Sequence, residues 1–187
     1  MAEKHYYMAC LDLEGRSCLV VGGGEVALEK VRGLLDCGAR VTVVSPQALP
    51  ELVSLPVEWL RRPYRSSDLD DRLIVIGATS TSSVNRRVFA DAEERRVPCN
   101  VVDVPSLCSL ILPAVHRQGP IAVAVSTGGA SPALAQRIRD DVARTIGPEH
   151  AELAHRLRSL RPWAKQHLPT YEARRDYFRS LVDRALT

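Results

Sequence analysis

The sequence predicts an α/β protein whose main part is a Rossmann-like, doubly wound parallel sheet, followed by a smaller second part. A short apolar segment, Ser17–Val21, leads into a run of three glycines, and a helical pattern over residues 25–37 follows it. Apolar segments then alternate with helical patterns as far as residue 103, as they do in βαβ units. Residues 73–78 are apolar without interruption, which is typical of a parallel strand buried on both faces.

The glycine turn has the composition that a dinucleotide-binding βαβ unit requires. Gly22 permits the tight turn, and Gly24 lets the backbone approach a pyrophosphate, toward which the N–H groups of the helix start point. Ala27 occupies the third small position, where helix and strand pack closely. The alternative is a glycine turn without a ligand. We assign cofactor binding to this turn and to the strand ends beside it: Gly22, Gly23, Gly24, Glu25, Val26, Ser45, Pro46 and Thr79.

The rest of the predicted sheet comes from further short apolar segments. We expect strands at Arg40–Val44, residues 57–60 and residues 98–103. A helix over Ser82–Arg95 precedes the last of these strands. In a doubly wound sheet, ligands bind at the carboxyl ends of the strands. We therefore expect the glycine turn, Ser45, Thr79 and Asp103 to lie at one edge of the sheet.

After Pro105 the pattern changes. Two apolar runs, residues 109–113 and 121–126, are joined by a polar loop that contains a Gly-Pro turn. An exposed strand pair is open to pairing with another chain, so we expect dimerisation to cover it. Ser131 is a suitable N-cap for a helix that runs to about residue 146. Two further helical patterns follow over residues 149–161 and 171–186.

The composition is that of an ordinary globular chain. Apolar residues make up 45% of the 187 residues, and no apolar run approaches the roughly 20 residues that a membrane-spanning helix needs. The N-terminus has no basic stretch followed by an apolar segment, so we predict no signal peptide. The five cysteines are scattered, without a Cys-x-x-Cys pair. We therefore expect reduced cysteines, a cytoplasmic location, no membrane contact and no cysteine-based metal site.

The charge is distributed unevenly along the chain. Residues 1–112 carry 13 Lys and Arg against 15 Asp and Glu, whereas residues 113–187 carry 12 against 7. A cationic second part suits an anionic partner. Nucleic acid is not expected, because this part lacks interleaved aromatic residues and a helix-turn-helix signature. A small polycarboxylate fits at least as well, and the alternative is a solvated basic face.

Four segments stand at ligand-facing positions of this plan. They are residues 21–27 (VGGGEVA), residues 77–79 (GAT) with Asn85, residues 100–105 (NVVDVP) and residues 124–132 (AVSTGGASP). Together they resemble the precorrin-2 dehydrogenase/sirohydrochlorin ferrochelatase family, which is the siroheme synthase type without its methyltransferase domain. The resemblance covers nearly the whole chain.

The resemblance implies a reaction and a domain plan. Family members use NAD⁺ to remove two hydrogens from precorrin-2, which gives sirohydrochlorin, and many then insert Fe²⁺ to give sirohaem. They are homodimers, and their tetrapyrrole substrate carries several carboxylates that arginines can bind. The chain would then contain an NAD-binding Rossmann domain over residues 1–112, a dimerisation segment over residues 113–146 and a helical substrate-cleft segment over residues 147–187.

The resemblance also implies roles for individual residues. Asp103 matches the family's catalytic aspartate, and a carboxylate there can accept the proton that dehydrogenation releases. The same carboxylate can accept a pyrrole proton or guide the metal as Fe²⁺ enters, and its alternative role is to cap the following turn. For Asn100 a structural hydrogen bond is an equal alternative. For residues 126–129 the alternative is a helix entry that needs glycine for its backbone geometry. Substrate contacts are expected from Asn100, Ser126, Thr127, Gly128 and Arg137.

The end of the second strand departs from the general NAD pattern. Ser45, Pro46 and Gln47 stand where an acidic residue would bind the ribose 2′-hydroxyl. The family tolerates this departure, so we predict NAD as the cofactor, and the absence of an arginine at these positions argues against NADP⁺. No metal site is predicted, because His150 and His155 are five residues apart and do not share a helix face.

Two alternative functions stay open at this point. A dehydrogenase that has lost chelation would share all of these motifs. A non-catalytic, nucleotide-sensing Rossmann module would need neither turnover nor Asp103. The segments around Asp103 and Thr127, together with the basic second part, count against the sensor.

Overall fold

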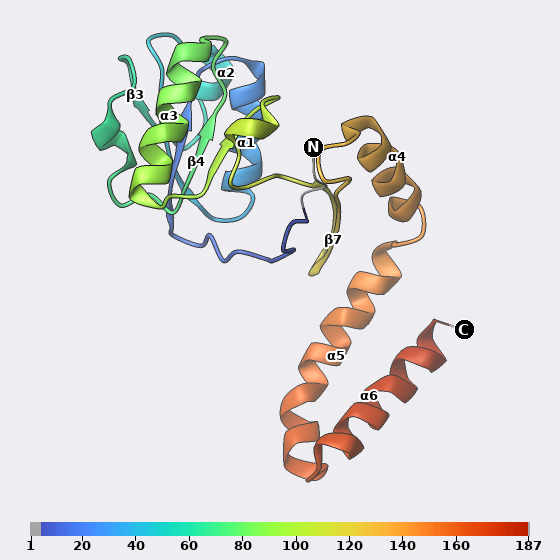
Figure 1. Ribbon diagram of the computed structural model, residues 1–187. Helices are drawn as coiled ribbons and strands as arrows, with labels where there is room; N and C mark the ends of the chain where they lie inside the picture. The colour runs from blue at the N-terminus through green and yellow to red at the C-terminus, as the bar shows by residue number, and fades with distance from the viewer. Residues whose placement is uncertain (1–4, 187) are drawn as a thin grey trace. The chain divides into compact units, whose positions relative to one another are not determined.

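The computed structural model describes residues 5–186. The chain divides into two compact units, the first ending at Leu112 and the second beginning at Pro113. Each unit has its own sheet (Figure 1). Among the described helices, none is both long enough and apolar enough to cross a membrane.

The first unit is built on a five-stranded parallel sheet, which confirms the predicted fold class. The strand order is β3-β2-β1-β4-β5. Strands β2 and β3 therefore lie on one side of β1, and β4 and β5 lie on the other. Every neighbouring pair is parallel, and the carboxyl ends therefore share one edge. The strands are β1 (Ser17–Val21), β2 (Arg40–Val44), β3 (Glu58–Leu60), β4 (Ile74–Gly77) and β5 (Cys99–Val101).

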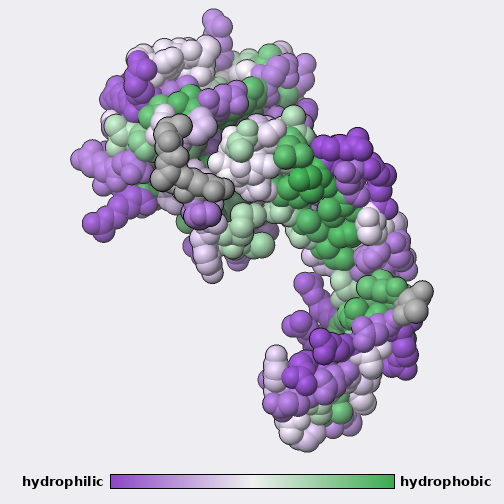
Figure 2. Space-filling model, turned by 45° about the vertical axis from the view of Figure 1, so that its right-hand side comes forward, coloured by the Kyte–Doolittle hydropathy of each residue, from purple (hydrophilic) through white to green (hydrophobic). Residues whose placement is uncertain are grey.

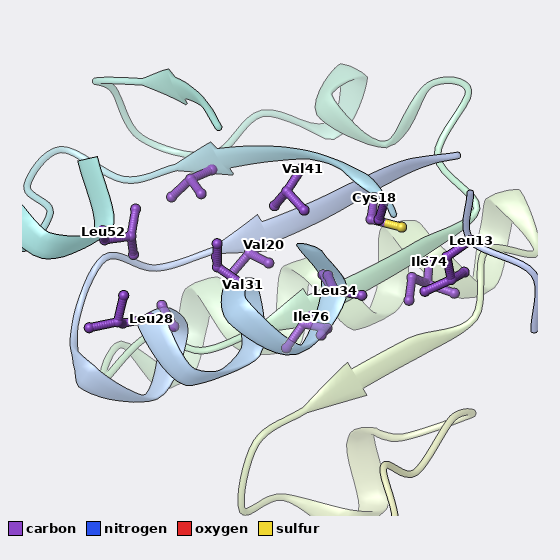
Figure 3. Close-up of a cluster of buried hydrophobic side chains, with 13 residues drawn as sticks. Leu13, Cys18, Val20, Leu28, Val31, Leu34, Val41, Leu52, Ile74 and Ile76 are labelled. Carbon is purple, nitrogen blue, oxygen red and sulfur yellow. The ribbon is translucent and has the colours of Figure 1, made fainter. Parts of the chain in front are cut away.

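Helices cover both faces of this sheet. Helices α1 (Glu25–Leu35) and α2 (Pro50–Val53) pack on one face, and α3 (Ser82–Arg95) packs on the other (Figure 1). Successive strand residues point to opposite faces, so Val20 packs against α1, whereas Leu19 lies in the core under α3. Figure 3 shows Leu28, Val31 and Leu34 of α1 in one buried cluster with Val20, Val41 and Ile76. Burial on both faces explains why these strands are continuously apolar.

The second unit consists of an antiparallel hairpin and three helices. The hairpin strands are β6 (Ala114–Gln118) and β7 (Ile121–Val125). Helix α4 (Pro132–Ala143) packs against both strands, and α5 (Pro148–His167) packs against α6 (Tyr171–Ala185). The Ser131 side chain accepts a hydrogen bond from the Leu134 N–H, as its predicted N-cap role requires.

The sequence prediction for the first strand of the hairpin was wrong. The segment expected to be a loop, residues 114–120, contains strand β6, and the run expected to be a strand, residues 109–113, is not one. Gln118 pairs with Ile121 across a turn in which Gly119 has φ +55°, as the first position of a type II′ turn requires. Such a short turn forces the strand to begin directly beside it. Residues 109 and 110 instead donate backbone hydrogen bonds to the Cys99 oxygen at the edge of the first sheet.

Helix α5 is longer than predicted. We expected this helix over residues 149–161, but it continues through Pro162 to His167. A proline inside a helix removes one backbone hydrogen bond and usually ends it. Here Ala164 is fully buried, and the rings of Trp163 and His167 stack with their centroids 4.8 Å apart. Packing of the last turns therefore outweighs the local cost of the proline.

A buried ion pair stabilises the loop between β3 and β4. Arg62 donates two hydrogen bonds to the Asp68 carboxylate, at 2.6 and 2.9 Å, and the Arg65 N–H donates a third at 2.8 Å. Burial by itself would raise the pKa of the Asp68 carboxyl. The hydrogen bonds from Arg62 and Arg65 outweigh burial, and they hold the pKa below its usual value.

We predict that Asp68→Asn lowers the free energy of unfolding at pH 7 by about 2 kcal/mol, because it breaks a largely buried charge pair. The folded-state pKa of Asp68 is lowered, so its stabilisation is complete above about pH 4 and is lost as pH falls through that folded value. Urea unfolding between pH 2 and pH 7 should show the gap between wild type and variant closing on the acid side. The matched control is the exposed Asp70→Asn, for which we expect a change below about 0.5 kcal/mol. A gap that is constant with pH would contradict the ion-pair explanation.

Candidate functional site

The glycine turn after β1 lies against the end of β4. Gly22 has φ +132°, and a Cβ atom there would overlap the backbone oxygen of Ala78. The Gly22 N–H donates to the Val44 oxygen at 3.0 Å, and the Ala78 N–H donates to the Val21 oxygen at 2.8 Å. The ends of β2, β1 and β4 are thus held together by backbone contacts that only glycine permits at position 22.

The next two glycines have different surroundings. A Cβ atom on Gly23 would overlap the Gln47 oxygen, and the Gly23 oxygen accepts a hydrogen bond from the Leu49 N–H at 2.9 Å. Gly24 is the N-cap of α1, and a Cβ atom there would have nothing within 4 Å. With no capping side chain at Gly24, the first N–H groups of α1 are left without an intrahelical partner, and Glu25 and Val26 are exposed. This open cradle fits a pyrophosphate.

The polar side chain that follows β2, that of Ser45, is buried. Ser45 is 9% exposed, and its hydroxyl donates to the Gln47 oxygen at 2.6 Å. The Ser45 oxygen accepts a hydrogen bond from the indole N–H of Trp59, which lies on the neighbouring strand β3. Pro46 is exposed beside it. Ser45 and Pro46 therefore offer a cofactor mainly backbone and apolar surface.

The turn after β4 is stabilised from α3. The Thr79 hydroxyl accepts a hydrogen bond from the Thr81 N–H at 2.9 Å, and the Asn85 amide donates to the Thr79 oxygen at 2.9 Å. The Oδ1 atom of Asn85 is buried and has no hydrogen-bond partner among the described residues. A Cβ atom on Gly77 would lie 3.5 Å from this Oδ1. Asn85 therefore stabilises the turn that carries Thr79. The sequence motif included Asn85 but did not indicate this role.

Asp103 lies two residues beyond β5, in a left-handed backbone conformation. Its φ is +61°, which asparagine and aspartate adopt more readily than other non-glycine residues. The side chain is exposed, and within residues 5–186 no hydrogen bond or ion pair engages its carboxylate. The alternative considered for Asp103, a cap on the following turn, is therefore not supported by a hydrogen bond among these residues. The carboxylate is available to act on a bound molecule.

Asn100 has a structural partner. Its side chain is 9% exposed, and its amide donates to the Leu110 oxygen at 2.9 Å. The same amide lies 3.7 Å from the Cys108 sulfur, and the Cys108 thiol donates to the Val101 oxygen at 3.3 Å. This bonding corresponds to the structural alternative considered for Asn100, and substrate contact by Asn100 stays a prediction.

The other predicted substrate-binding residues belong to the second unit. The Thr127 hydroxyl accepts from the Ser131 N–H and donates to the Ser131 oxygen, each at 3.0 Å, and Ser126 accepts from the Gly128 N–H. Gly128 has φ +63°, so the turn requires glycine for its geometry. Arg137 is exposed on α4, 3.3 Å from Asp141.

The structure thus brings the predicted cofactor residues and Asp103 together at the carboxyl edge of one sheet, and it places Ser126, Thr127, Gly128 and Arg137 in a separate unit. Sequence reasoning did not assign Trp59 to the site. No local signal marks it, because its contact with Ser45 depends on the pairing of β2 with β3.

Within the described part of the chain, no group of three or more His, Cys, Asp or Glu residues could hold a metal ion.

Comparison with known proteins gives the same division. The family described as putative NAD(P)-binding matches residues 9–114, and the family described as sirohaem biosynthesis protein central matches residues 118–145. A siroheme synthase from Thioalkalivibrio sulfidiphilus is 41% identical over 186 residues, which are 97% of this chain and 38% of that protein. A siroheme synthase from Ectopseudomonas mendocina is 43% identical over 168 residues, which are 89% of this chain and 36% of that protein.

A solved structure agrees over nearly the full length. The precorrin-2 dehydrogenase SirC has a TM-score of 0.81 and 26% identity, covering 97% of this chain and 92% of that one. By contrast, the chain spans less than two fifths of the length of these two siroheme synthases. The chain therefore belongs to the precorrin-2 dehydrogenase/sirohydrochlorin ferrochelatase family, of the siroheme synthase N-terminal type, and its first unit is a precorrin-2 dehydrogenase-like, NAD-binding module.

Proposed function

We propose that this chain catalyses the NAD⁺-dependent dehydrogenation of precorrin-2 to sirohydrochlorin. The observation that carries the proposal is the unpaired, exposed carboxylate of Asp103 at the same sheet edge as the open glycine turn. A dinucleotide site and a free base at one edge are the two parts that hydride removal with loss of a proton requires.

The residues at this edge divide the work. The N–H groups at the start of α1 bind the pyrophosphate, and Gly24 leaves room for it. Gly23 holds the β2–α2 loop, and Asn85 holds the β4–α3 turn, so that both ends of the cofactor meet fixed backbone. Bound NAD⁺ supplies the hydride acceptor. Asp103 accepts the proton that leaves the tetrapyrrole when the hydride is removed.

We further propose that the second unit binds the substrate and that the enzyme then inserts Fe²⁺. Its excess of Lys and Arg, 12 against 7 Asp and Glu, supports binding of a polycarboxylate. Ser126, Thr127, Gly128 and Arg137 are the expected contacts, with Asn100 and Asp103 from the first unit. In chelation, Asp103 would accept a pyrrole proton as Fe²⁺, a substrate of this step, enters.

We also propose that the protein is a homodimer that pairs through the second unit. Apolar side chains support this assembly: Leu134 and Ile138 of α4 are 51% and 39% exposed, and Val115 of β6 is 37% exposed. Leu134 and Ile138 are four residues apart and so share one face of α4, and an exposed apolar helix face is typical of protein–protein contacts. Figure 2 shows apolar surface of this kind on one face of the molecule.

The decisive experiment is an anaerobic assay of the purified protein with fresh precorrin-2 and NAD⁺, followed by Fe²⁺. We expect NADH and the sirohydrochlorin spectrum first, and the sirohaem spectrum after Fe²⁺ at a rate above that of protein-free controls. Sirohydrochlorin without accelerated chelation would identify a monofunctional dehydrogenase. Cofactor binding without any NADH would leave the nucleotide-sensing module as the function.

The glycine turn can be tested at Gly24, where a side chain fits without moving the backbone. Gly24→Asp should bind NAD⁺ at least about tenfold more weakly, because its carboxylate would repel the pyrophosphate. Folding should not suffer, since aspartate is a good N-cap. The isosteric, uncharged Gly24→Asn is the control, and calorimetric titration of both variants measures the difference. A Gly24→Asp variant with the NAD⁺ affinity of wild type would argue against a pyrophosphate at this turn.

Asp103 is best tested with asparagine, which tolerates the left-handed backbone. We expect Asp103→Asn to keep its NAD⁺ affinity and thermal midpoint while its dehydrogenase turnover falls by about 10²- to 10⁴-fold, as for loss of a general base. Asp71→Asn is a matched control, because Asp71 is also exposed with φ +58° but precedes β4. Near-normal turnover of Asp103→Asn in the NADH assay would remove Asp103 from the mechanism.

A further inference from the structure

We propose that the adenosine-ribose part of the cofactor site accepts a 2′-phosphate, with Arg61 as its counter-charge, so that this chain binds NADP⁺ as well as NAD⁺. The inference rests on the dinucleotide site of the proposed function and adds a second ligand to it.

The end of β2 has no group that selects a free ribose hydroxyl. NAD-specific Rossmann proteins place a carboxylate there, which binds the 2′-hydroxyl and repels a 2′-phosphate. In this chain residues 45–47 are Ser-Pro-Gln, and the Ser45 hydroxyl is already bonded to the Gln47 oxygen at 2.6 Å. A 2′-phosphate would therefore meet no negative charge from these residues.

Strand β3 brings an arginine to this position. The Ser45 N–H donates to the Leu60 oxygen at 3.3 Å, so Arg61 follows the point where β2 and β3 end together. The Trp59 indole donates to the Ser45 oxygen at 3.1 Å, which fixes the ring at the end of β2. The Arg61 guanidinium lies over this ring, 5.7 Å from its centroid. A planar cation is thereby held beside the expected ribose.

The charge of Arg61 is available. The neighbouring Arg62 is neutralised by its two hydrogen bonds to Asp68. Arg61 is exposed, and among the described residues it forms no ion pair with an acidic side chain. A guanidinium binds phosphate through paired hydrogen bonds, and this is how NADP⁺-binding Rossmann proteins accommodate the 2′-phosphate. The absence of an arginine within residues 45–47 does not exclude NADP⁺, because the arginine comes from the adjacent strand.

The test is calorimetric titration of the full chain with NAD⁺ and with NADP⁺. We expect wild type to bind NADP⁺ within about tenfold of NAD⁺. Arg61→Gln should weaken NADP⁺ binding by about three- to fivefold, the effect of one exposed charge pair, and change NAD⁺ binding less than twofold. Arg86→Gln is the matched control, because it removes the same charge from an exposed site on α3 and should change neither affinity. Higher salt should reduce the preference of wild type over Arg61→Gln for NADP⁺.

A second pair of probes isolates the phosphate. Adenosine 2′,5′-bisphosphate should respond to Arg61→Gln as NADP⁺ does, whereas adenosine 5′-monophosphate should not. NAD⁺ binding without NADP⁺ binding would overturn this inference and leave the proposed dehydrogenase intact. An equal loss of both cofactors in Arg61→Gln would also overturn it. Absence of NAD⁺ binding by wild type would overturn the dinucleotide site itself, and the proposed function with it.

Discussion

The close approach of Gly22 to Ala78 is the contact on which the candidate site depends. A β-carbon at Gly22 would overlap the Ala78 carbonyl oxygen, so the turn after β1 can lie against the end of β4 only with glycine there. Backbone hydrogen bonds then join the ends of β2, β1 and β4. Because these bonds involve main-chain atoms at the ends of paired strands, they hold the backbone of the candidate cofactor site in place.

In the first unit, most of the candidate site residues lie in the loops that follow the strands. Both faces are covered by helices, and strand residues such as Val20, Val43 and Val75 are fully buried. Exposed polar side chains that could act on a ligand are therefore expected mainly where strands end. Asp103 illustrates this, since it follows the short strand β5 and turns left-handed, with a carboxylate that nothing in the described chain neutralises. An aspartate in this conformation costs little, whereas most other side chains would be strained there.

The second unit was less accessible to sequence reasoning than the first. Strand β6 contains His116, Arg117 and Gln118, and its polar residues suggested a loop. In the structure it is one half of a hairpin with alternately exposed residues, and the His116 ring lies 3.3 Å from the Ile146 oxygen. Only the pairing across Gly119 and Pro120 reveals the strand, because a single strand of mixed polarity has no strong local signal.

The sequence by itself determined the parallel sheet, the glycine turn and the family. Each of these is encoded in short, contiguous segments with a strict local pattern, such as residues 21–27 and 73–78. Tertiary structure decided which distant residues share the site. The partner of Asn100 is Leu110, and the neighbour of Ser45 is Trp59 with Arg61 above it. These contacts follow from the pairing of separate strands and loops, and hydrogen bonds between strands depend on register rather than on any local sequence pattern.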